Sequence, residues 1–392
     1  MTGPHQTHRL LGYRLLVCLG PGGVGKTTIS ATLALSAALA GQRVDVMTVD
    51  PAPRLLDALG LGGVDAAEPH DLALDDVTPD SIHDTRTTND AAGRVAGAGT
   101  AARRRPAPCA GRLRALRMDP KRTFDRTVAR HAPSPAAADA IMQNRIYRNI
   151  SQALAGVGDY MAMERLLELS EEPATDLVVL DTPPAREALD FLEAPRRLLD
   201  LLNSRAVTLL GGGMRRGFSV VDLAARAVLS AFDRLTGLHL LADVQAFVRS
   251  FDGMYAGFAE RAARAQRLLV APDTAVVVVT TAEPERIAQA HEFLAALRRA
   301  GIEPRAVIVN RTLPAIMPRE QIARAPLEPA LKRKLARAAA EFAALKQRET
   351  AAIASLRAGE SPQLELVAAP DLGRDPADLA DLARLGQSLE VV

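Results

Sequence analysis

The chain has 392 residues, enough to bury a large core as one α/β domain with a helical insert or as two smaller domains. Its formal net charge of +2 gives no general reason to expect nucleic acid or an anionic membrane as the main partner. Two cysteines exclude a disulfide framework and a cysteine-rich zinc site.

The first predicted elements are a strand, a turn and a helix. Residues 15–19 form a short apolar run, a glycine-rich turn follows, and residues 27–40 are rich in Ala and Leu. Gly41 is a typical helix stop signal. No signal segment precedes this strand, and no apolar run approaches the roughly 18 to 20 residues that span a bilayer. We therefore expect a cytoplasmic location.

Two more predicted strands each end at an aspartate. Residues 44–49 are rich in valine and lead to Asp50, and the apolar residues 177–180 lead to Asp181. Further strands are expected at residues 276–279, 306–309 and 364–367, with a helix over residues 285–300. Continuous apolar strands alternating with helices predict an α/β fold with a mostly parallel sheet flanked by helices. Ligands of such sheets bind beyond the carboxyl ends of the strands.

Two stretches interrupt this alternation. Residues from about 119 to 172 and from about 195 to 268 read as helical, and we expect them to form a helical subdomain inserted in a single domain over residues 10–392. Four methionines there would suit an adaptable groove for a client helix, although methionine on helices is more often core. These are Met161, Met163, Met214 and Met254.

A long helix is predicted over residues from about 330 to 358. Leu331, Leu335, Ala338, Phe342 and Leu345 repeat at 4-3-4-3 spacing and form one apolar seam. Packing on its own subdomain is the ordinary interpretation, and a helix that binds a partner is the alternative.

Residues from about 84 to 117 lose all periodicity and become rich in Ala, Gly, Arg and Pro. The arginines include the run 103–105 and Arg112, Arg114 and Arg117. We expect a poorly ordered basic loop. Binding of an anionic partner is the alternative for such a run.

Residues 20–27 match the pattern G-x-x-x-x-G-K-[ST] between a strand and a helix. Glycines let backbone N–H groups surround phosphates, and the helix N-terminus adds partial positive charge. We expect the nucleotide to bind Gly20, Gly22, Gly23, Val24, Gly25, Lys26, Thr27 and Thr28.

Four side chains of this region have predicted catalytic or metal-binding roles. Lys26 reaches the β- and γ-phosphates, Thr27 and Asp181 hold Mg²⁺, and Asp50 positions the attacking water. An aspartate at a strand end is common by itself, but two of them with a P-loop favour the functional interpretation. The residues alone predict a nucleoside triphosphate and Mg²⁺.

Several segments together resemble the ArsA family, which includes arsenite-pump ATPases and ATPases that target tail-anchored proteins. They are the glycine-rich turn, residues 48–55, 121–125, 160–164, 179–184, 188–192 and 307–311. The resemblance implies a dimeric ATPase of the deviant Walker A class that hydrolyses ATP with Mg²⁺ and acts as a conformational switch on a protein partner. It places Asp50 in switch I, Asp181 in switch II and Asn310 in adenine recognition.

The chain departs from this class at one position. The class has a second lysine after the first P-loop glycine, and here that position is Pro21. A cation at the transferred phosphoryl group can raise the rate roughly 10³- to 10⁵-fold, about 4 to 7 kcal/mol. Either Arg186 or a lysine-bearing paralogue in a heterodimer could replace it. A slow homodimer stays equally open, as does a nucleotide-sensing regulatory subunit with little turnover.

The cysteines of the chain argue against two ligands of the family, arsenite and zinc. Arsenite capture needs several converging thiolates, whereas Cys18 lies in a predicted core strand and Cys109 stands alone. The C-x-x-C pair that holds zinc in the targeting ATPases is missing, so we expect no zinc. Without a basic amphipathic terminal helix, we expect no nucleic acid and no stable membrane insertion. An unidentified protein client remains.

Overall fold

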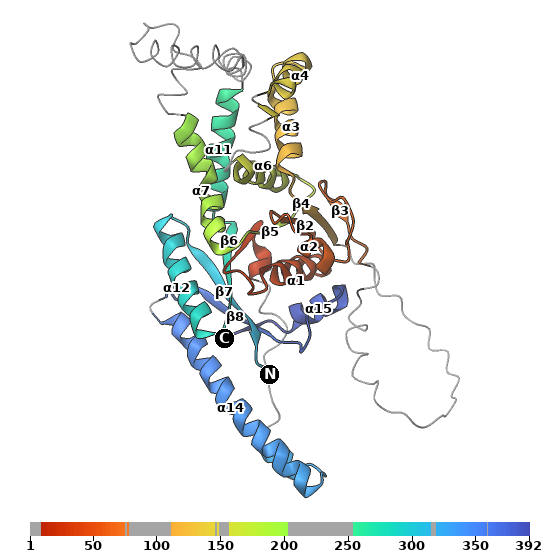
Figure 1. Ribbon diagram of the computed structural model, residues 1–392, viewed down its shortest axis with the longest axis vertical. Coiled ribbons are helices and arrows are strands. Elements are labelled where there is room, and N and C mark those ends of the chain that lie inside the picture. Colours follow the sequence, from red (N-terminus) through yellow and green to blue (C-terminus); the bar gives the residue numbers. More distant parts are fainter. Residues whose placement is uncertain are drawn as a thin grey trace, which may run out of the picture. The chain divides into compact units, whose positions relative to one another are not determined.

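The computed structural model describes residues 9–74, 77, 111–145, 147–148, 157–202, 254–314, 319–358 and 360–392. The chain divides into two compact units, each described by itself below (Figure 1). The sheet unit comprises Met1–Arg117, Glu172–Ala185 and Pro272–Val392. The helical unit comprises Met118–Glu171 and Arg186–Ala271.

The sheet unit is built on nine strands within the described residues, in the order β3-β4-β2-β5-β1-β6-β7-β8-β9 (Figure 1). The strands are β1 Leu15–Leu19, β2 Arg43–Thr48, β3 His70–Asp71, β4 Arg112–Arg117, β5 Leu177–Asp181, β6 Thr274–Thr281, β7 Pro304–Thr312, β8 Glu365–Pro370 and β9 Glu390–Val391. All neighbours pair in parallel except β3 with β4 and β8 with β9, at the two edges. The predicted α/β fold with a mostly parallel sheet is thus confirmed.

The sheet unit also contains several helices. They are the 3₁₀-helix Leu10–Gly12 and the α-helices α1 Lys26–Leu39, α2 Arg54–Ala58, α12 Pro284–Arg299, α13 Arg319–Arg324, α14 Pro329–Arg357 and α15 Leu379–Gln387. Leu33 of α1, Leu55 of α2 and Leu382 of α15 are buried in one cluster with alternate strand residues such as Val46 and Val179. Alternation along a strand places these residues on one face of the sheet. Helix α12 packs on β6 and β7 through residues outside that cluster.

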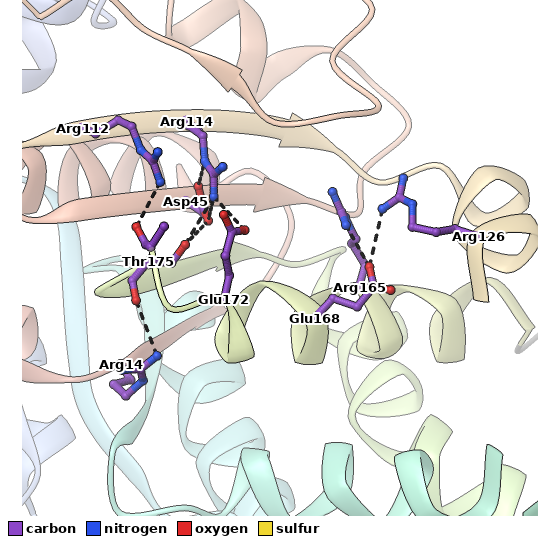
Figure 2. A network of polar contacts seen from close by, with 10 residues as sticks. Arg14, Asp45, Arg112, Arg114, Arg126, Arg165, Glu168, Glu172 and Thr175 are labelled. Carbon is purple, nitrogen blue, oxygen red and sulfur yellow. Dashed lines mark hydrogen bonds and ion pairs between the residues drawn. The ribbon is translucent and has the colours of Figure 1, made fainter. Parts of the chain in front are cut away.

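Strand β4 corrects the prediction of a poorly ordered loop over residues 84–117. Residues 84–110 lie outside the described part, but residues 112–117 pair with β2 in parallel. The reason is that Asp45 on β2 is fully buried. Arg114, its partner in the register, donates to both carboxylate oxygens at 2.6 and 2.7 Å (Figure 2). Thr175 and Glu172 complete the network. The arginine therefore neutralises a charge inside the sheet and is not part of a solvated loop.

The helical unit contains α3 Pro120–His131, α4 Pro135–Gln143, α6 Val157–Glu171, α11 Tyr255–Leu269 and most of α7, Ala185–Leu202. Side chains of Asp119 and Ser134 cap α3 and α4, and a proline at the first helical position follows each. Helix α7 begins ten residues before the predicted start of the second helical stretch, and Pro195 lies inside it. Residues 203–253 of that stretch lie outside the described part.

Aromatic rings and ion pairs hold the helical unit together. Phe258 of α11 packs edge-on against Phe124 of α3, with ring centroids 6.2 Å apart. Glu168 of α6 accepts from Arg126 and Arg165 at 3.5 and 2.8 Å (Figure 2). Met161, Met163 and Met254 are each 1% exposed and therefore belong to the core, whereas Met214 lies outside the described residues.

Helix α14 forms as predicted, but most of the residues predicted for its seam are exposed. Leu331, Leu335 and Leu345 are 44%, 38% and 50% exposed, and Ala338 is exposed as well. The ordinary interpretation, packing on its own subdomain, is therefore wrong for these residues. No described helix of the protein has both the length and the apolar character to cross a bilayer.

Candidate functional site

The glycine-rich turn joins β1 to α1 at the carboxyl end of the central strand. Gly20 and Gly25 have φ angles of +149° and +86°, values that residues other than glycine rarely adopt. A Cβ at Gly20 would collide with the carbonyl oxygen of Val279 on β6, and a Cβ at Gly25 would collide with Nδ2 of Asn310 on β7. Both glycines are thus required by the close packing of the turn against its neighbouring strands.

Lys26 begins α1 and turns back over the loop. Its Nζ donates to the carbonyl oxygens of Gly20 and Pro21 at 3.1 and 3.0 Å, and the residue is only 8% exposed. Burial lowers the pKa of Lys26, and the carboxylates of Asp181 and Asp50 oppose that shift. The ammonium group lies under the turn, where it can exchange carbonyl partners for phosphate oxygens.

Asp181 ends β5 between β1 and β2, and three hydroxyl groups donate to its carboxylate. Thr27 and Thr48 donate to Oδ2 at 2.9 and 3.1 Å, and Ser30 donates to Oδ1 at 3.4 Å. The residue is 1% exposed, and this burial raises the pKa of Asp181 to about 6 although the hydrogen bonds lower it. Among the described residues no cationic side chain bonds to this buried carboxylate, which is therefore suited to a bound cation.

Asp50 lies two residues beyond the end of β2. Its Oδ1 accepts from the backbone N–H of Ala52 at 2.9 Å, and Arg54 approaches Oδ2 at 3.9 Å. Its own N–H donates to the hydroxyl of Thr48 at 3.2 Å. The same hydroxyl donates to Asp181, so Thr48 joins the segments that carry both aspartates.

Asn310 lies near the end of β7 and is 5% exposed. Its amide Nδ2 donates to the carbonyl oxygen of Val24 at 2.9 Å. Arg311, the next residue, has a positive φ of 57°. The asparagine therefore braces the turn from the β7 side.

Every predicted site residue lies on or beside this turn. The nucleotide-binding candidates Gly20, Gly22, Gly23, Val24, Gly25, Lys26, Thr27 and Thr28 form the turn and the start of α1, Asp181 contacts Thr27, and Asn310 contacts Val24. Asp50 is linked to Asp181 through Thr48. Their functional roles stay predictions, and the side chain of Arg186 lies outside the described part.

Sequence reasoning missed Thr48 and Ser30. Ser30 lies one turn after Lys26 on α1 and accordingly faces the same side. Thr48 is the last residue of β2 and stands opposite Asp181 in the parallel register. A hydroxyl residue at a strand end, two residues before a candidate aspartate, was the available signal.

The donor set fits a magnesium nucleotide. Mg²⁺ takes oxygen ligands, and in nucleotide sites it uses one or two protein groups with phosphates and water. The Thr27 hydroxyl and the Asp181 carboxylate supply such oxygens, and the adjacent turn and helix N-terminus suit phosphates. No group of three or more His, Cys, Asp and Glu side chains that could form a metal site occurs in the described ranges. The fold and the turn define a P-loop nucleotide-binding protein.

Comparison with known proteins gives the family. The model of the anion-transporting ATPases matches residues 13–72 and 111–326, so the chain belongs to this family, the ArsA family. It is 26% identical over 317 residues to an uncharacterized protein of Streptomyces coelicolor, covering 80% of this chain and 66% of that one. It is 24% identical over 226 residues to the ATPase GET3 of Malassezia globosa, covering 57% and 55%. The matches thus span less than two thirds of either relative.

Proposed function

We propose that the protein binds ATP with Mg²⁺ at the P-loop, hydrolyses it to ADP and phosphate, and uses this cycle to switch its conformation on a protein partner. The observation that carries the proposal is the 2.9 Å hydrogen bond between Thr27 and Asp181, at the start of α1. It brings a hydroxyl and a buried carboxylate together beside the phosphate-binding turn. Membership in a family of ATPases supports the same activity.

Each residue has a defined task in this proposal. Bound Mg²⁺ would neutralise charge on the phosphates and help orient them. Thr27 and Asp181 hold that cation, and its charge favours the ionised form of Asp181. Lys26 leaves the carbonyls of Gly20 and Pro21 and donates to the β- and γ-phosphates, and Asp50 orients the water that attacks. Asn310 keeps the turn in place and, by the family resemblance, contacts adenine.

The test is ATP hydrolysis by the purified full chain with Mg²⁺, measured together with binding of a fluorescent ATP analogue. We expect turnover that Lys26→Ala reduces at least 100-fold, since a preorganised charge at the transferred group is worth roughly that much. Lys121→Ala is the matched control, because Lys121 pairs with Asp125 in the helical unit. Turnover that is unaffected by Lys26→Ala would refute the proposal.

A second candidate is a nucleotide-sensing regulatory subunit, and Pro21 favours it. The position after the first P-loop glycine offers a carbonyl oxygen to Lys26 and no cation. In this case the protein binds ATP, barely hydrolyses it, and works in a heterodimer with a lysine-bearing relative; a homodimer is the other arrangement.

Pro21→Lys separates the two candidates. If the missing cation limits turnover, the variant hydrolyses ATP at least tenfold faster than the wild type while its ATP affinity changes little. Fast wild-type turnover with no gain from Pro21→Lys would reject the regulatory role and show that another group, such as Arg186, replaces the lysine.

A further inference from the structure

The heptad frame of the α14 seam extends along the whole helix, although one of its positions holds the charged Glu349. Glu349 and Leu356 stand 14 residues beyond Leu335 and Phe342, so they occupy the same positions of the repeat. Glu349 is 7% exposed and Leu356 is fully buried. The C-terminal half of the seam is therefore already a packing face of the sheet unit.

Nearer its N-terminus α14 contacts α13, and Lys332 donates to the carbonyl oxygen of Ala323 at 2.9 Å, but the leucines of the seam stay exposed. Helix α14 has 29 residues and is about 43 Å long. In Figure 1 it extends past α12, and its first turns lie away from the sheet. Seven large hydrophobic residues are exposed in the described part of the chain; Leu331, Leu335 and Leu345 of the seam are three of them.

The width of the seam identifies the kind of surface it fits. At 100° per residue, the five residues from Leu331 to Leu345 fall within about 80° of the helix circumference. A helix lying in a membrane interface presents a broader apolar face, whereas a strict seam at 4-3-4-3 spacing fits one further helix. The geometry favours a helix as the occupant.

The charges beside the seam identify the chemistry of that helix. Between Leu331 and Arg348 there are six basic residues and one acidic residue, a net charge of +5. The heptad position directly before Leu335, Phe342 and Glu349 forms one flank of the seam and holds Lys334, Glu341 and Arg348. Glu341 is paired with Arg337, so the flank keeps a basic excess. A second copy of this chain would bring an equally basic helix alongside, and like charges along a helix pair are repulsive.

We propose that residues 329–348 of α14 are a docking surface for an amphipathic helix of another protein with acidic residues on its flanks. The leucines of the seam contact the apolar stripe of that helix, and Lys334 and Arg348 pair with its carboxylates. This surface is separate from the nucleotide site, so the proposal does not depend on ATP hydrolysis.

The experiment uses the full chain and two synthetic 21-residue helical peptides. Both carry leucine at the a and d positions; one carries glutamate and the other lysine at the e and g positions. Fluorescence anisotropy of the labelled peptides measures affinity. We expect the glutamate peptide to bind at least tenfold more tightly than the lysine peptide. The variant Leu331→Gln/Leu335→Gln should lose that binding by at least tenfold.

Charge reversal distinguishes specific pairing from general adhesion. The variant Lys334→Glu/Arg348→Glu should bind the glutamate peptide more weakly and the lysine peptide more tightly than the wild type does. Unchanged unfolding temperature and ATP-analogue binding show that each variant is folded, which is expected because these side chains are exposed.

Three results would overturn the proposal. Equal affinity for both peptides would mean that charge does not select the occupant. Concentration-dependent dimerisation in sedimentation experiments, abolished by Leu331→Gln/Leu335→Gln, would identify a second copy as the occupant. Binding to vesicles containing 30% phosphatidylserine, abolished by the same variant, would identify a membrane surface.

Discussion

The buried carboxylate of Asp181 should make the nucleotide-free protein less stable at neutral pH. Its pKa is raised to about 6, largely by burial, whereas an unfolded aspartate has a pKa of about 3.9. The unfolded state therefore ionises first as the pH rises, and above pH 6 this group lowers the free energy of unfolding by about 3 kcal/mol. Below about pH 4 the carboxyl is protonated in both states and the effect vanishes.

Asp181→Asn removes the charge and keeps the shape. We expect the nucleotide-free variant to be more stable than the wild type by up to about 3 kcal/mol at pH 7.5, and by about half of that at pH 5. The amide oxygen can accept from Thr27 and Thr48, and the Ser30 hydroxyl can rotate to accept from the amide. Urea unfolding followed by circular dichroism measures the difference. A variant whose stability relative to the wild type is the same at both pH values, or lower at pH 7.5, would refute this reasoning.

Three other substitutions test contacts described above. Thr48→Val should lower the turnover number more than the ATP affinity, because the Thr48 hydroxyl joins Asp50 and Asp181. Thr48→Ser keeps a hydroxyl and should restore the turnover number. A Thr48→Ser variant as inactive as Thr48→Val would contradict this role. Arg114→Leu should cost about 3 to 5 kcal/mol in urea unfolding by leaving buried Asp45 unpaired, and adding Asp45→Val should recover most of that loss. The carboxylate of Glu349 accepts a hydrogen bond from the N–H of Leu313 at 2.7 Å, so Glu349→Ala should speed hydrogen exchange of that amide. Glu341→Ala, at an exposed position of the same helix, should leave the exchange rate unchanged. Equal exchange rates in both variants would show that this contact does not hold the segment.

Apolar runs predicted most of the sheet because parallel strands covered by helices are apolar on both faces. Strand β1 has the predicted bounds, and the ends of β2 and β5 place Thr48 and Asp181 together. Strand β4 was missed because three of its six residues are arginines. The available signal lay elsewhere: Asp45 inside an apolar strand requires a cation, and only a tertiary contact reveals which arginine supplies it.

The candidate site divides in the same way. The P-loop and its strand–turn–helix context can be recognised from local sequence, because the chemistry depends on backbone N–H groups and a helix N-terminus. The hydroxyl groups around Asp181 come from three separate segments, and their common target appears only once the order of β2, β5 and β1 is known. The exposure of the α14 seam could not be predicted either, because periodicity shows which face of a helix is apolar but not which element packs against that face.

Contacts of α14 with Leu313 give the helix a physical link to the nucleotide site. Lys346 donates to the carbonyl oxygen of Leu313 at 2.6 Å, and Glu349 accepts from the N–H of the same residue. Leu313 follows β7 closely, and Asn310 of β7 donates to Val24 in the P-loop turn. Three hydrogen bonds and three residues of backbone thus connect the helix to the turn. If nucleotide binding changes the position of Asn310, the same path carries that change to α14, and a partner on α14 must by linkage alter nucleotide affinity by an equal factor.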